Sequence, residues 1–256
     1  MNARRVIQFS CGAASAVAAK LTISKDPSAV VVNAYVAEEH EDNRRFLHDV
    51  ERWLGVSIEV LRDEKYGASA YEVFRRAKYT KGMYGAPCSR ALKRDLLEAW
   101  AKPDDIPVLG FTAEEEDRAE RYLDANNGRA EFPLIDAGLT KADCLALIER
   151  AGIRPPVMYS LGYNNANCIG CVKGGAGYWN KIRRDFPERF EQMALIEDAI
   201  GPSAYLMRNR QSGVRIPLRQ LDPKEGRHNV VVPECGFACA AAEEAMSATT
   251  TEGSEA

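Results

Sequence analysis

The chain has 256 residues, 46% of them hydrophobic, and a formal net charge of −3 at pH 7. This length and hydrophobic content are sufficient for one α/β domain with a C-terminal appendage. The net charge argues against nucleic-acid binding through bulk positive charge, and no apolar stretch approaches the length of a membrane span. We therefore expect no membrane partner.

The stretch from 5 to 21 predicts a strand, a loop of small residues and a helix. Val6–Phe9 is a short apolar run with β-branched residues, as in a buried strand, and an alanine-rich helix follows from Ala13. Where a helix begins after a small-residue loop, free backbone N–H groups converge and the helix dipole adds partial positive charge. The stretch therefore predicts an oxyanion site with Ser10, Gly12 and Ser15 as contacts. Packing alone is the alternative explanation for such a turn.

Further strands and helices alternate along the first part of the chain. Strands are predicted at 29–36, 56–61 and 106–111, helices at 43–54, 71–78, 90–101 and 139–151, and a short strand or edge segment at 132–135. This alternation is typical of a parallel, doubly wound sheet. We expect Arg90, Lys93 and Arg94 to lie on the exposed face of their helix.

The character of the sequence changes after residue 155. We expect residues 1–155 to form an α/β nucleotide-binding domain and residues 156–239 to form a helical, cysteine-bearing region that closes over its site. A helix-rich segment is predicted at 178–200. Residues 240–256 are small, polar and acidic, which predicts a disordered tail.

The cysteines indicate reduced thiols. There are seven of them, an odd number that includes two local pairs, which does not fit a secreted disulfide framework and favours a cytoplasmic protein. Cys168-x-x-Cys171 has the spacing of a metal or cluster ligand pair. A thioredoxin-like redox pair and a pair of buried structural cysteines are the alternatives.

Four other cysteines are assigned from their surroundings. Cys88 opens a helix in a basic environment, which favours its thiolate and makes it a candidate third anchor. Cys235 and Cys239 form a second pair just before the tail, and either could complete a cluster. Cys144 lies on the apolar face of a predicted helix, so we expect it in the core.

Basic residues near the predicted ligand edge could neutralise phosphate or sulfate. Arg118 and Arg121 follow the carboxyl end of a strand, where doubly wound sheets bind ligands, and Lys173 follows the cysteine pair. We interpret Lys181, Arg183 and Arg184 as a solvated helix face.

In this order, the motifs resemble the PP-loop superfamily of adenine nucleotide α-hydrolases, and within it the phage and prophage members of the phosphoadenosine phosphosulfate (PAPS) reductase family. Ser10–Ser15 stands where the family has S-G-G-x-D-S, and Gly110–Arg121 resembles the block that lines the nucleotide. Cys88 with Cys168-x-x-Cys171 resembles the iron–sulfur ligands of adenylyl-sulfate reductases. Glu234–Gly236 resembles the start of the C-terminal E-C-G-x-H motif, whose cysteine attacks sulfate sulfur.

The resemblance implies a set of site residues. A [4Fe–4S] cluster would be held by Cys88, Cys168, Cys171 and either Cys239 or Cys235, with Cys235 as nucleophile if it is not a ligand. An adenine nucleotide (APS, PAPS or ATP) would be bound by Ser10, Cys11, Gly12, Ala13, Ser15, Asn33, Gly110, Phe111, Glu114, Arg118, Arg121 and Lys173. The chain departs from the family at Ala14, Ser89 and Ala238, which replace the loop aspartate, a second adjacent cysteine and the C-terminal histidine.

The resemblance also implies a reaction, in which Cys235 attacks the sulfate sulfur and a thioredoxin-like thiol donor releases sulfite. The first alternative is an iron–sulfur-dependent sulfur transferase that adenylates a nucleobase of tRNA or DNA, with ATP and Mg²⁺. The second is a nucleotide-binding regulatory protein without catalysis. The sequence leaves the oligomeric state open, a homo-oligomer included.

Overall fold

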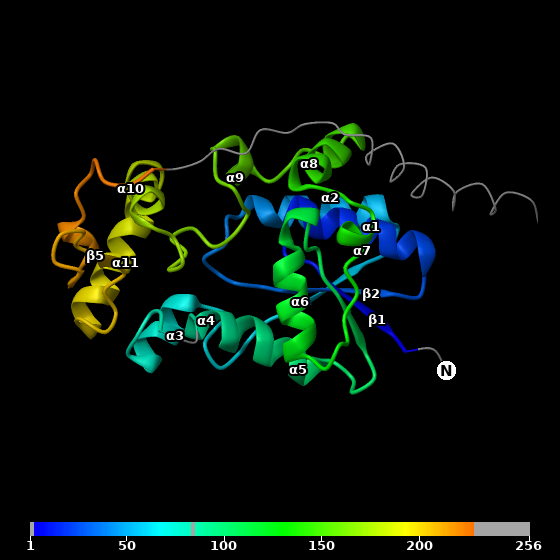
Figure 1. Cartoon of the computed structure of the whole chain (residues 1–256), viewed down its shortest axis with the longest axis horizontal. Helices are drawn as coiled ribbons and strands as arrows, with labels where there is room; N and C mark the ends of the chain where they lie inside the picture. Colours follow the sequence, from blue (N-terminus) through cyan, green and yellow to red (C-terminus); the bar gives the residue numbers. More distant parts are fainter. Residues whose placement is uncertain (1–2, 83–84, 228–256) are drawn as a thin grey trace, which may run out of the picture.

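A computed structural model describes residues 3–82 and 85–227 of the chain. In these residues, four parallel strands form the central sheet in the order β3-β2-β1-β4 (Figure 1). Their bounds are β1 (Arg5–Gln8), β2 (Val30–Ala34), β3 (Ile58–Leu61) and β4 (Ile106–Val108). The predicted α/β class with a parallel sheet is therefore confirmed. The last three strands are shorter than predicted: β2 and β4 end before their apolar runs do, and β3 begins two residues later than expected.

Helices α1 (Ala13–Lys25), α2 (Asp42–Leu54), α7 (Pro133–Asp136) and α8 (Lys141–Arg150) lie together on one side of the sheet (Figure 1). Helix α1 packs against the other three, and its alanines are buried among residues of β1, β2 and α8. Small side chains allow this close approach of a central helix. Cys144 is fully buried in this core, as predicted.

A second core joins segments that are distant in the sequence. It is formed by α3 (Ala70–Ala77), α9 (Val157–Ser160), α10 (Ala176–Asp185), α11 (Pro187–Ile200) and the segment around Cys88. Its largest fully buried side chains include Phe74, Leu92, Trp179 and Ile182. Residues before and after 155 therefore share this core.

Two of the predicted elements differ in the structure. The segment 132–135 is not a strand, because Pro133 lacks an N–H for a ladder and instead occupies the first turn of α7. Strand-like pairing there is limited to one bridge between Val108 and Glu131. The helix predicted at 90–101 consists of α4 (Pro87–Ser89), a π segment (Arg90–Arg94) and α5 (Asp95–Trp100).

The remaining elements are short apart from α6 (Glu116–Ala125), which follows a 3₁₀ turn (Ala113–Glu115). After α11, β5 (Met207–Arg208) and β6 (Arg215–Ile216) pair antiparallel, and a 3₁₀ turn (Leu218–Gln220) follows. Among the described helices, none combines the length and the apolar character needed to cross a membrane.

Gly110 allows the end of β4 to touch the start of α1. A Cβ added at this position would lie 2.8 Å from Cα of Ser15 and 2.9 Å from its backbone nitrogen. Both contacts are to backbone, which cannot rotate away as a side chain can. The spacing between β4 and the loop before α1 therefore depends on glycine at this position.

We expect Gly110→Ala to lower the free energy of unfolding by about 1–3 kcal/mol, the usual cost of overpacking, because α1 must move away from β4. The measurement is chemical denaturation followed by circular dichroism. Gly82→Ala is the control, since its Cβ would make only an ordinary contact at 3.8 Å. Equal effects of the two substitutions would contradict this account.

Candidate functional site

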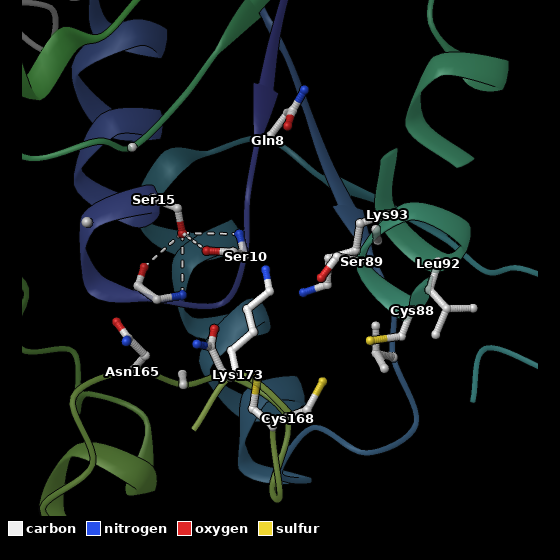
Figure 2. A pocket seen from close by; sticks show the side chains of 18 of the residues that line it. Gln8, Ser10, Ser15, Cys88, Ser89, Leu92, Lys93, Asn165, Cys168 and Lys173 are labelled. Atoms are coloured by element: carbon white, nitrogen blue, oxygen red, sulfur yellow. Dashed lines mark hydrogen bonds between the residues drawn. The ribbon is translucent and has the colours of Figure 1, made fainter. Parts of the chain in front are cut away.

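A pocket of about 950 Å³ lies at the carboxyl ends of β1, β2 and β4. This edge is where open parallel sheets bind ligands, and the volume is within the range of small-molecule sites. Its wall includes the loop before α1, the loop after β4, the residues around Cys88 and the turn that carries Cys168 and Cys171 (Figure 2). Four segments that are far apart in the sequence therefore meet at one site.

Ser15 organises the loop before α1. Its Oγ accepts hydrogen bonds from the backbone N–H of Ser10 (3.1 Å) and of Gly12 (3.3 Å) and from Oγ of Ser10 (3.2 Å), and it donates to the carbonyl of Gly12 (2.9 Å; Figure 2). Ser10, Gly12 and Ser15 all line the pocket. The loop is thus held in one shape by its own hydroxyls, beside the positive end of the α1 dipole.

Cys11 and Asn33 support this loop from behind and do not line the pocket. Cys11 has φ +56°, in the left-handed region that favours glycine, and its thiol is fully buried. The amide of Asn33 donates to the carbonyl of Phe9 at 2.8 Å and lies 3.6 Å from Sγ of Cys11. Burial raises the pKa of Cys11 to about 12, so its thiol stays protonated at neutral pH.

Tyr159 of α9 reaches the first turn of α1. Its hydroxyl accepts a hydrogen bond from the backbone N–H of Ala13 at 3.3 Å, and Tyr159 lines the pocket whereas Ala13 does not. Sequence reasoning missed Tyr159, because no local motif signals a contact between residues that are 146 positions apart.

The block after β4 contributes Gly110, Phe111, Glu114 and Arg118 to the pocket. The guanidinium of Arg118 lies over the ring of Phe111, 4.2 Å from its centroid, and pairs with Glu115 at 2.6 Å. Arg121 is exposed and does not line the pocket, because it lies one turn further along α6. Of the two predicted arginines, the structure places only Arg118 at the site.

Cys88, Cys168 and Cys171 line the same pocket as Ser10, and all three are free thiols. Figure 2 shows Cys88 on the wall opposite Cys168, with Lys173 extending from the cysteine turn toward Ser10. The structure therefore brings together the thiols and the loop that the sequence separates. Cys235 and Cys239 lie outside the described residues.

The turn from Cys168 to Cys171 is fixed by Tyr178. Its hydroxyl accepts hydrogen bonds from the N–H groups of Gly170 (3.0 Å) and Cys171 (2.9 Å) and donates to the carbonyl of Cys168 (3.1 Å). Gly170 has φ +80°, and a Cβ there would lie 3.1 Å from the indole of Trp179. Glycine is thus required at this position for both backbone conformation and space.

Cys88, Cys168 and Cys171 are the candidate cluster ligands that lie within the described residues. The prediction that basic surroundings favour the thiolate of Cys88 is wrong, because burial outweighs them and raises the pKa of this thiol to about 11, with negative charge on Cys171 adding to the shift. Within residues 3–82 and 85–227, however, no group of three or more His, Cys, Asp or Glu side chains is arranged to hold one metal ion. In a cluster each thiolate binds a different iron, so its ligands lie further apart. Three thiols line the pocket, and a [4Fe–4S] cluster takes four thiolates.

Lys93 lies in the pocket instead of on the exposed face predicted for it, whereas Arg90 and Arg94 are exposed. A π turn contains one more residue than an α turn, which changes the side chains that face the site. Nζ of Lys93 is 3.3 Å from the buried carboxylate of Glu39. Burial alone lowers the pKa of Lys93, but the charges of Glu39 and Cys168 outweigh it and raise the pKa, so the ammonium stays charged beside the thiols.

Comparison with known proteins adds no family assignment. No model of a protein family and no curated protein matches this chain. The functional interpretation therefore depends on the residues and geometry of the pocket.

We expect the Lys93–Glu39 pair to be stronger than an exposed ion pair, because the carboxylate of Glu39 is buried. A double-mutant cycle with Lys93→Met and Glu39→Gln should give a coupling free energy above about 1 kcal/mol, measured by chemical denaturation. The same cycle on the exposed pair Arg90–Asp95, 3.4 Å apart, is the control and should give about 0.5 kcal/mol or less. Equal coupling in both cycles would refute the structural role of the buried pair.

Proposed function

We propose that this protein is a PAPS reductase-like enzyme with a PP-loop version of the doubly wound fold, which binds an adenylyl sulfate and reduces it to sulfite. The observation that carries the proposal is the pocket of about 950 Å³ that Ser10, Gly12 and Ser15 share with Cys88, Cys168 and Cys171. A phosphate-binding loop and a set of thiols are the two parts that this reaction requires side by side.

The nucleotide would lie along the sheet edge with its phosphate at the loop. Backbone N–H groups at a helix start and the α1 dipole favour an anion there. Lys173 extends toward Ser10 (Figure 2). Arg118 lines the pocket and lies over the ring of Phe111. Val32 and Ala34 at the end of β2 provide an apolar wall against which an adenine ring can pack.

The sulfur chemistry needs two thiols and no other oxidant or reductant. Cys235 as thiolate would attack the sulfate sulfur, the sulfur–oxygen bond to the α-phosphate would break, and the nucleoside phosphate would leave with the bonding electrons. A second thiol from a thioredoxin-like donor would attack Sγ of Cys235, which forms a disulfide and releases sulfite. The two thiols thus supply the two electrons that reduce the sulfate.

Cys88, Cys168, Cys171 and Cys239 would hold a [4Fe–4S] cluster, which would supply redox-active and electrostatic chemistry beside the sulfate and leave Cys235 free as nucleophile. Residues of this chain would balance the negative charge of the thiolates there. Lys93 and Lys173 bring positive charge to the thiols, because negative charge on Cys168 and Cys88 interacts with these two ammonium groups. Buried thiolates need such compensation.

We expect the wild-type protein, purified without oxygen, to contain iron and to release sulfite from APS or PAPS. Cys88→Ser should lower the iron content by more than half, because a cluster ligand is lost, whereas Cys144→Ala should retain iron, because Cys144 is buried away from the pocket. Iron and sulfide assays with an absorption spectrum measure the cluster content of each protein. A sulfite assay measures the reduction of APS or PAPS. Pyrophosphate release from ATP in the presence of tRNA or DNA, without sulfite, would instead favour the sulfur transferase.

Arg118 and Arg121 provide a matched pair on one helix. We expect Arg118→Ala to weaken nucleotide binding about 10-fold, roughly the effect of losing one charge-assisted hydrogen bond, and Arg121→Ala to leave binding unchanged, since only Arg118 lines the pocket. Isothermal titration with PAPS and with AMP measures both variants. Equal losses of nucleotide affinity in the two variants would contradict the proposed position of the nucleotide beside Arg118.

A further inference from the structure

Tyr71 is the second residue of α3, and hydrogen bonds fix the start of this helix. The buried carboxylate of Glu38 accepts hydrogen bonds from the hydroxyl of Ser69 at 2.6 Å and from the backbone N–H of Ala70 at 2.8 Å, which fixes the first turn of α3 at the end of β2. Tyr71 follows directly in this turn and lines the pocket. Its ring is therefore held in place by the fold before any ligand binds.

The hydroxyl of Tyr71 is buried beside the cysteine turn without a hydrogen-bond partner among the described residues. The side chain is 9% exposed, and a Cβ added to Gly170 would lie 4.0 Å from the hydroxyl oxygen. The guanidinium of Arg189 approaches this oxygen but can only donate to it, so the phenolic hydrogen still has no acceptor. A buried polar group left without a partner is destabilising, so an acceptor is expected there.

The hydroxyl of Tyr71 makes no hydrogen bond to the backbone of this turn. The carbonyl of Cys168 already accepts a hydrogen bond from the hydroxyl of Tyr178. The sulfur atoms of Cys168 and Cys171 line the same pocket and are acceptors that this turn offers. Burial raises the pKa of Tyr71 to about 12, and the negative charges of Glu38 and, to a smaller extent, Cys168 add to the shift.

We propose that Tyr71 donates a hydrogen bond to a sulfur atom of the cluster bound through Cys168 and Cys171, and thereby raises the cluster's reduction potential. The inference rests on the proposed function, because it needs the cluster. A hydrogen bond to sulfur withdraws negative charge and stabilises the more negative, reduced state. In this proposal Tyr71 tunes the redox group through its hydroxyl.

The test is Tyr71→Phe, which keeps the aromatic ring and removes only the hydroxyl. We expect unchanged iron content, because no ligand is lost, and a midpoint potential that shifts to more negative values in a dye-mediated titration followed by electron paramagnetic resonance. We also expect the wild-type Fe–S stretching bands in resonance Raman to shift in D₂O, and the shift to shrink in Tyr71→Phe. Tyr66→Phe is the matched control, since Tyr66 precedes the same helix but does not line the pocket; its potential should equal that of the wild type.

The outcomes separate this inference from the proposed function. Iron-containing wild type and Tyr71→Phe with equal potentials would overturn the role of Tyr71 and leave the cluster intact. A wild-type protein without iron would overturn the cluster and the role of Tyr71 together, while nucleotide binding at the loop would still be measured independently.

Discussion

The site depends on the second core, which places three thiols beside the loop before α1. Leu92, Phe74 and Trp179 are buried together, although they come from the segment after Cys88, from α3 and from α10. This packing orients Cys88 from one side and the turn of Cys168 and Cys171 from the other. Since packed interiors tolerate little displacement, the positions of the thiols follow from the apolar contacts and not from the thiols themselves.

The same packing sets the charge of the pocket. The carboxylate of Glu38 accepts hydrogen bonds at the start of α3. The carboxylate of Glu39 forms an ion pair with Lys93. Lys173 extends into the pocket from the cysteine turn (Figure 2). The α1 dipole adds positive charge at the loop and favours an anion there, while Glu114 and Glu115 line another part of the pocket.

The features that the sequence predicts correctly are local, and those it misses depend on the tertiary structure. The strand before Ser10 and the buried position of Cys144 follow from hydrophobic periodicity. Lys93 was misplaced because periodicity assumes an α-helix, whereas its segment is a π turn. Tyr71 and Tyr159 carry no motif at all. Their importance arises only from the cysteine turn and the α1 start that they meet in the folded chain.

One continuous segment connects the two ends of the pocket. At its start, the hydroxyl of Tyr159 accepts a hydrogen bond from the backbone N–H of Ala13, next to the loop before α1. At its end lie Cys168 and Cys171. Between them, the carbonyl of Ala166 accepts from Asn43 of α2 at 3.0 Å. The N–H of Ile169 donates to the carbonyl of Glu38 at 2.9 Å. These contacts tie the segment to the sheet edge along its length. A displacement of the loop before α1 would therefore be transmitted along this segment toward the thiols or resisted by its contacts.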